Sequence, residues 1–180
     1  FRRVLFRSVR CKFPGAGSGE FAANRSLTIK EQLVMAKERV SRKLPKEKYG
    51  YIAYFQAFTN TYGTVEELEP MFRQAAEDSE VYLLSIATRP DCLDVDMLKL
   101  LERINQQKPV WIELGLQTIH PQTAAYIRRG YDLHTYDEAV SELKKRKLDV
   151  ITHVILGLPG ESVEQMLETV SYVGNTGTQG

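Results

Sequence analysis

The chain has 180 residues, 43% of them hydrophobic, and its formal net charge at neutral pH is +1. This size and composition are sufficient for one domain with a hydrophobic core, and the near-neutral charge does not indicate a strongly basic surface for nucleic acid. No apolar run approaches the roughly 18 residues of a transmembrane helix, no signal peptide is recognisable, and the cysteines do not suggest a disulfide scaffold, so we predict a cytoplasmic protein with no membrane partner.

Residues 1–8 differ in character from the rest of the chain. They read Phe-Arg-Arg-Val-Leu-Phe-Arg-Ser, which resembles the conceptual translation of a short-read sequencing adapter, and we expect them to be non-native. At the other end, the sequence stops where a further strand would be expected. We therefore predict that residues 9–180 form a partial core domain, truncated at both ends.

The rest of the sequence alternates between helical and strand patterns. Helical periodicity, with Ser, Thr or Asp caps at several starts, predicts helices over 29–44, 64–78, 94–106, 121–129, 135–147 and 162–173. Capping boxes are expected at Thr28 with Glu31, Thr64 with Glu67, Thr135 with Glu138, and Ser162 with Gln165. Apolar runs predict buried strands over 51–55, 81–87, 110–116 and 150–156.

This alternation predicts an α/β fold with a parallel sheet whose faces are covered by helices. Right-handed crossovers then lead either to a barrel or to a doubly wound sheet. A complete eightfold barrel needs about 250 residues, so this chain supports only part of one.

Polar residues and glycines follow several of the predicted strands. Glu113, Gly115 and Gln117 share one face of their strand by its period of two, and Gly115 leaves space beside that face. A later strand runs through His153 into Gly157-Leu158-Pro159-Gly160, where glycine allows a ligand to approach the backbone closely. In a βα barrel the C-terminal ends of the strands carry the chemistry.

These strand ends, together with the run Thr88-Arg89-Pro90-Asp91, resemble the radical S-adenosylmethionine (SAM) enzymes, and especially the branch that includes the catalytic subunit of Elongator. The resemblance implies a partial (β/α) TIM-like barrel with its parallel strands inside the helices. It implies an enzyme that binds a [4Fe–4S] cluster and SAM. Such an enzyme takes an electron from a reducing donor, cleaves SAM to a 5′-deoxyadenosyl radical and abstracts hydrogen from a substrate. The substrate is unknown, and RNA is suggested only by analogy with Elongator.

The resemblance also assigns one cluster ligand. Cys11 precedes Gly17-Ser18-Gly19-Glu20-Phe21, as the last cluster cysteine of the family precedes a similar run, so Cys11 is the expected metal ligand. Thiolates suit iron–sulfur clusters because they are soft and charged. The C-x-x-C partner of Cys11 would be at position 8, which is Ser8 within the adapter-like segment. Cys92 lies in a later loop and is not expected to contribute.

Three residues near one strand are implied SAM contacts. Gln117 aligns with a glutamine that contacts the SAM ribose in related enzymes, and a buried amide needs such hydrogen-bonding partners. Arg129 follows twelve positions later, the spacing at which an arginine of coproporphyrinogen-dehydrogenase-like relatives binds the SAM carboxylate. Glu113 is a further candidate. The alternative for Glu113 and Gln117 is a buried polar pair bonded to neighbouring loops.

Gln56 and Asn60 are candidates because the family often has a SAM-binding Gly-Gly-Glu-like motif at the end of their strand, although this chain departs from that motif. Arg89 is a candidate anion clamp, with a local turn pair to Asp91 as the equal alternative.

The last strand supplies two candidates. His153 lies where relatives place a ribose contact, with a satisfied core histidine as its alternative. Gly157 is the expected neighbour of the adenine, with a purely structural turn as its alternative.

Two other functions stay open at this point. A TIM-barrel lyase or aldolase would use Glu113, His153 or lysines in acid–base chemistry without iron or SAM. A non-catalytic, RNA-associated binding module would cleave no SAM at all.

Overall fold

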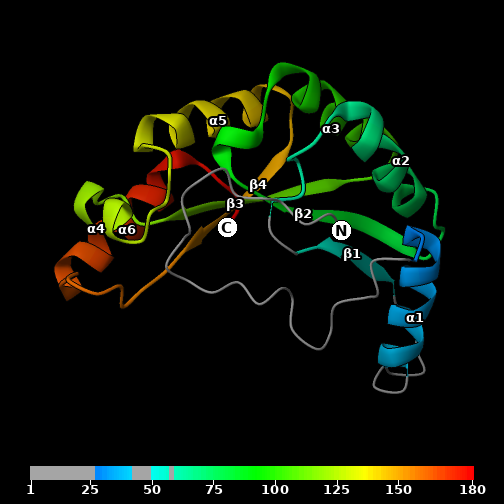
Figure 1. The fold of residues 1–180 in the computed structure, drawn as a ribbon, viewed down its shortest axis with the longest axis horizontal. Coiled ribbons are helices and arrows are strands. Elements are labelled where there is room, and N and C mark those ends of the chain that lie inside the picture. The colour runs from blue at the N-terminus through cyan, green and yellow to red at the C-terminus, as the bar shows by residue number, and fades with distance from the viewer. Residues whose placement is uncertain (1–26, 42–49, 57–58) are drawn as a thin grey trace.

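The computed structural model describes residues 27–41, 50–56 and 59–180. Its centre is a parallel sheet of the strands β1 (Tyr51–Phe55), β2 (Val81–Thr88), β3 (Val110–Gln117) and β4 (Asp149–Val154), in the order β1-β2-β3-β4 (Figure 1). Each strand therefore pairs with the next strand in the sequence, and helices connect them. The predicted α/β class is confirmed.

The helices of the described residues follow the predicted order. They are α1 (Ile29–Ser41), α2 (Val65–Ala76), α3 (Val95–Gln107), α4 (Pro121–Tyr126), α5 (Leu133–Lys145) and α6 (Val163–Thr176), with a short 3-10 helix η2 (Pro90–Cys92) after β2. Helices α2, α3 and α5 lie against one face of the sheet, and α1 lies beyond the edge formed by β1 (Figure 1). No helix in the described ranges is both long and apolar enough to cross a membrane.

Strand β3 shows how the sequence divides the sheet into two faces. Val110, Ile112, Leu114 and Leu116 are each 1% exposed or less and point toward the helices, as the period of two requires. The intervening residues Trp111, Glu113, Gly115 and Gln117 point to the other side and are only half-buried. We call this second side, which also carries Tyr54, Ser85 and His153 from the neighbouring strands, the polar face.

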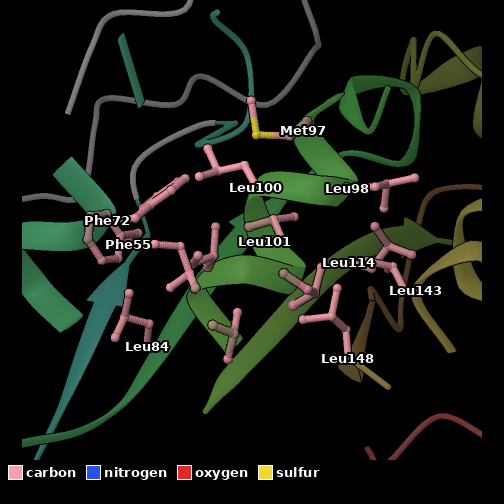
Figure 2. Close-up of a cluster of buried hydrophobic side chains, with 14 of the residues drawn as sticks. Phe55, Phe72, Leu84, Met97, Leu98, Leu100, Leu101, Leu114, Leu143 and Leu148 are labelled. Carbon is pink, nitrogen blue, oxygen red and sulfur yellow. The ribbon is translucent and has the colours of Figure 1, made fainter. Parts of the chain in front are cut away.

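The main hydrophobic core lies between the sheet and the helices. Figure 2 shows leucines of α3 meeting Leu84 and Leu114 from the strands, with Phe55 and Phe72 beside them. The rings of Phe55 and Phe72 meet edge to face with their centroids 5.2 Å apart, a geometry that aromatic pairs favour. Burying this apolar surface is the main stabilising contribution to the fold.

Most helix starts follow the predicted capping chemistry. Thr64 and Ser162 form complete capping boxes with Glu67 and Gln165. Thr28 and Glu31 exchange the same reciprocal bonds, in which the backbone N–H of Thr28 donates to Glu31 at 2.7 Å.

The capping box predicted at Thr135 with Glu138 is wrong. Helix α5 begins at Leu133, and its N-cap is Asp132, three residues before Thr135, because Asp132 accepts hydrogen bonds from the backbone N–H and the hydroxyl of Thr135, both at 2.8 Å. A carboxylate at the N-cap also interacts favourably with the helix dipole.

Helix α4 and strand β4 end earlier than expected because of turns that follow them. Helix α4 stops at Tyr126 rather than at residue 129, because Arg128 (φ 56°) and Gly130 (φ 88°) turn the backbone into the left-handed region. Strand β4 stops at Val154 rather than at residue 156, ahead of Gly157 with φ 84°. The end of the helix predicted over 29–44 lies outside the described residues.

The outer edge of β4 is hydrogen-bonded by the last residues of the sequence. The backbone N–H of Gln179 donates to the carbonyl of Val150 at 2.9 Å, and the N–H of Thr152 donates to the carbonyl of Gly180 at 2.7 Å. The chain therefore runs beside β4 at the position where the sequence predicts a further strand.

Candidate functional site

The C-terminal end of β3 has an unusual backbone. Gln117, its last residue, has φ 64°, which non-glycine residues rarely adopt. The pairing with β4 shifts register between Gly115 and Gln117, and the carbonyl of Gln117 accepts a hydrogen bond from the N–H of Ile155 at 2.9 Å. Such strain is held in place by the surrounding structure and is concentrated at functional sites.

The Gln117 side chain is oriented by a tyrosine that the sequence did not single out. The hydroxyl of Tyr131 lies 3.0 Å from Oε1 of Gln117 and 2.5 Å from the carbonyl oxygen of Gly115. Burial raises the pKa of Tyr131, so this hydroxyl stays protonated and remains a donor. Nε2 of Gln117 makes no hydrogen bond to the described residues, so the amide keeps free donors for a ligand.

Arg129 lies directly behind this strand end and is only 6% exposed. Its Nη1 donates to the carbonyl oxygens of Leu116 (3.0 Å) and Thr118 (2.6 Å), and its Nε donates to that of Tyr131 (3.0 Å). Its guanidinium lies 4.8 Å from the centre of the Tyr131 ring. Burial lowers the pKa of Arg129, and no carboxylate of the described residues pairs with it. Nη2 has no hydrogen-bond partner among those residues.

Arg89 forms the local pair with Asp91 that was the alternative to an anion clamp. Its Nε and Nη2 donate to the carboxylate of Asp91 at 2.8 and 2.6 Å, and its guanidinium lies 5.3 Å from the ring centre of Tyr131. Because the bidentate pair occupies one edge of the guanidinium, the geometry favours a structural role over the predicted anion clamp.

Glu113 is the centre of a hydrogen-bonded cluster on the polar face. Its Oε2 accepts from the hydroxyl of Tyr54 on β1 at 2.7 Å and lies 2.9 Å from Nε2 of His153 on β4. Its Oε1 accepts from the hydroxyl of Ser85 on β2. Burial and the Glu113 carboxylate raise the pKa of Tyr54 to about 12, so the phenol remains protonated. Each of the four strands thus contributes one polar side chain to the Glu113 cluster.

His153 is not the satisfied core histidine of the alternative interpretation, because 52% of its side chain is exposed. The Glu113 side chain is only 13% exposed. The structure therefore places Glu113 and His153 in direct contact with each other, rather than with Gln117 at the strand end.

Gln56 and Asn60 follow β1 but differ in environment. Gln56 is exposed. Asn60 is 9% exposed, and its Nδ2 donates to the carbonyl oxygens of Phe55 (2.6 Å) and Ala87 (2.8 Å). Asn60 therefore ties the ends of β1 and β2 together, and this use of its amide leaves little donor capacity for a ligand.

The turn after β4 is open. Gly157 and Gly160 have φ 84° and 89°, and a side chain built on either would meet no atom within 4 Å. The C-terminal edge of the sheet therefore has two features that a ligand could contact, the open glycine turn and the free amide of Gln117.

Comparison with known proteins decides the family. A model of the radical SAM superfamily matches residues 10–173, which is nearly the whole chain. The chain belongs to the radical SAM superfamily.

Two bacterial radical SAM relatives are similar in sequence to nearly the whole of this chain. The chain is 43% identical over 171 residues to the uncharacterised protein YtqA of Bacillus subtilis, covering 94% of this chain and 52% of YtqA. It is 38% identical over 171 residues to the protein YhcC of Escherichia coli, covering 94% of this chain and 54% of YhcC. The chain therefore spans about half the length of these curated relatives.

The radical SAM fold is also seen in a solved structure. The archaeal Elp3 of Methanocaldococcus infernus, with residues 1–46 deleted, matches with a TM-score of 0.67 and 18% sequence identity, covering 82% of this chain and 38% of Elp3. This likeness confirms the predicted barrel-type α/β fold.

The cysteine that the radical SAM resemblance assigns to the cluster, Cys11, lies outside the described residues. Cys92, within them, lies in η2 and is half-buried. Burial raises the pKa of its thiol to about 11, which favours the neutral thiol over the thiolate that would bind iron.

Three side chains of the candidate site were not predicted from the sequence of this radical SAM chain: Tyr54, Ser85 and Tyr131. The sequence did contain a signal for two of them. Ser85 is a polar residue within an otherwise apolar strand, and Tyr54 lies on the same face of its strand as the candidate Gln56. Tyr131 gave no signal, because its contacts with β3 depend on the turn formed by Arg128 and Gly130.

Proposed function

We propose that this chain is part of a radical SAM enzyme that binds a [4Fe–4S] cluster and SAM and acts on a substrate by hydrogen abstraction. The observation that carries the proposal is the arrangement of Gln117, Tyr131 and Arg129 at the end of β3. There a strained residue presents a free amide nitrogen at the edge where barrel enzymes bind their ligands.

The residues at this edge fit SAM. The free Nε2 of Gln117 suits a ribose hydroxyl, because an amide nitrogen donates to hydroxyl oxygens. Arg129 is a cation with no carboxylate partner among the described residues, and its Nη2 suits the carboxylate of an amino acid. The glycine turn at Gly157 leaves room for a planar base to lie against the backbone.

The chain's own part in the reaction is to orient and to shield. Tyr131 fixes the Gln117 amide, and Arg129 fixes the strand end by binding the carbonyl oxygens of Leu116 and Thr118. The cluster and SAM, when bound, supply an electron and a carbon-centred radical. The barrel wall then keeps solvent hydrogen away from the reacting atoms. Cys11 is the residue that we assign to the cluster.

The proposal is tested by detecting 5′-deoxyadenosine. A protein extended to the length of its relatives is reconstituted with iron and sulfide without oxygen, reduced with dithionite and supplied with SAM. We expect iron to be bound and 5′-deoxyadenosine to form. The variant Gln117→Ala should bind SAM more weakly, whereas Gln106→Ala, on the exposed side of α3, should bind it normally. Absence of both iron and 5′-deoxyadenosine would refute the proposal.

A further inference from the structure

Tyr131 reaches the end of β3 from the turn between α4 and α5. Its hydroxyl proton is shared between the carbonyl oxygen of Gly115, at 2.5 Å, and Oε1 of Gln117, at 3.0 Å. Because burial raises the pKa of Tyr131, the proton stays on the phenol. With Oε1 held toward Tyr131, Nε2 of Gln117 lies where a side chain on Gly115 would be. The hydroxyl therefore decides which atom of the Gln117 amide is left for a ligand.

The ring of Tyr131 contacts two arginines. The guanidinium carbons of Arg129 and Arg89 lie 4.8 and 5.3 Å from the ring centre, within the range of cation–π attraction. Arg129 also donates from Nε to the backbone carbonyl of Tyr131 at 3.0 Å. Arg89 is held in turn by Asp91, so the ring is fixed from the end of β2 as well. One side chain thus contacts both Gln117 and Arg129.

We propose that Tyr131 is a positioning residue that aligns the two groups through which this chain would hold SAM. Its hydroxyl orients the Gln117 amide toward the ribose, and its ring orients the Arg129 guanidinium toward the carboxylate. The inference rests on the proposed function, because Tyr131 acts only through these two neighbours. The two halves of SAM should therefore depend on different parts of one tyrosine side chain.

Two other tyrosine hydroxyls connect elements of the scaffold. Tyr172 on α6 donates to Asp137 on α5 at 2.6 Å, and the hydroxyls of Tyr136 on α5 and Thr152 on β4 lie 2.7 Å apart. Neither contact involves a residue that we assign to SAM. Tyr131 differs because its hydroxyl and its ring both contact such residues.

The first test needs neither the cluster nor SAM, and it measures how rigidly the Gln117 amide is held. The protein extended to the length of its relatives is labelled with ¹⁵N-glutamine, and relaxation of the side-chain nitrogens gives their order parameters. We expect about 0.8 for Gln117, typical of a rigid site, and less than about 0.6 for Gln106, which is exposed on α3. Tyr131→Phe, which keeps the ring, should lower the value of Gln117 toward that of Gln106. A mobile Gln117 amide in the unmodified protein, or one that Tyr131→Phe does not change, would overturn the proposal.

The second test separates the two halves of the ligand. Titration calorimetry gives the dissociation constants of adenosine and of L-methionine for the cluster-loaded extended protein. Loss of one hydrogen bond corresponds to about a tenfold change in affinity, so Tyr131→Phe should weaken adenosine binding by about that factor and change methionine binding by less than about twofold. Tyr131→Leu, which also lacks the ring, should weaken the binding of both. Tyr172→Phe, which loses its hydrogen bond to Asp137, is the matched control and should change neither.

The failures of the two proposals give different results. Equal losses of adenosine and methionine binding in Tyr131→Phe would indicate a general loosening of the strand end and would overturn the role of Tyr131. Adenosine binding that is the same in Tyr131→Phe and in the unmodified protein would overturn it as well. If the unmodified protein binds neither fragment and no SAM, the radical SAM proposal itself fails, and the alignment of SAM by Tyr131 fails with it.

Discussion

The side-chain amide of Gln117 occupies the space that a side chain on Gly115 would need. A β-carbon built on Gly115 lies 2.5 Å from Nε2 of Gln117, which is closer than such atoms can approach. The absence of a side chain at Gly115 is therefore what allows the amide to lie where it does, beside the hydroxyl of Tyr131.

This relationship predicts that Gly115→Ala separates ligand binding from stability. The atom in the way is at the end of a flexible side chain, so the amide can move at little cost, and we expect the free energy of unfolding to change by less than about 1 kcal/mol. SAM binding should weaken, because the amide is displaced. Thermal unfolding and equilibrium dialysis with SAM measure the two effects. Gly174→Ala, which meets no atom within 4 Å, is the control. Unchanged SAM affinity would show that the amide position is unimportant.

A second prediction concerns Arg129. Lysine cannot reproduce the planar fork that reaches three carbonyl oxygens, so Arg129→Lys should leave at least one of them unpaired. We expect a loss of about 2 kcal/mol in the free energy of unfolding, measured with urea. Arg128→Lys, at an exposed neighbouring position, should change it by less than about 0.5 kcal/mol. Equal midpoints for both variants would contradict the anchoring role of Arg129.

The ion pair between α1 and the turn before β2 predicts a pH-dependent contribution. Burial alone would raise the pKa of Asp78, but Lys37 at 2.7 Å and the backbone N–H of Glu80 hold it below its usual value. A lowered pKa in the folded state means that the stabilisation is complete above about pH 4, the usual pKa of Asp, and is lost as the pH falls through the folded-state value.

Lys37→Met should therefore reduce the free energy of unfolding by about 1 kcal/mol at pH 7, and this difference from the unmodified chain should shrink below about pH 4. Denaturant titrations across this range measure it. Lys30→Met is the matched control on the same helix, because Lys30 forms an exposed ion pair with Glu77 at 3.9 Å and no closer ion pair with the residues that the structure describes. A loss for Lys37→Met that is independent of pH would indicate lost packing instead of the ion pair.

Cys92 should be a slow nucleophile. Because burial raises the pKa of its thiol to about 11, only a small fraction is thiolate at pH 8, and the thiolate is the reactive form. Alkylation with iodoacetamide, mapped by mass spectrometry, should be much slower than for a free cysteine in solution. It should accelerate steadily as the pH rises toward 10. A fast reaction at pH 7 would contradict the buried thiol.

The sequence was a good guide to the fold because local rules act within each element. The alternation of strands and helices, the capping of α2 and α6 and the two faces of β3 all follow from short-range patterns. The capping of α5 was misassigned because Thr135 satisfies the same pattern as a cap, while the stronger capping group is Asp132. Short-range patterns cannot rank two such candidates without the path of the preceding turn.

The candidate site was less predictable because it depends on contacts between distant residues. Glu113 and His153 were both candidates, but their pairing across β3 and β4 required the register of the sheet. Asn60 and Arg89 are polar residues at the predicted strand ends, yet the structure uses them to bind backbone carbonyls and Asp91. A polar residue at a strand end is thus equally able to complete the scaffold or to face a ligand.

The strand order has a consequence for how the chain acquires its structure. The strands pair strictly in sequence, in the order β1-β2-β3-β4. Each newly synthesised strand can therefore pair with the strand before it, which has already formed. No strand has to wait for a distant segment or be inserted between two others, so loop closure is short at every step. The sheet is therefore suited to growing one unit at a time, from β1 toward β4, as the chain leaves the ribosome.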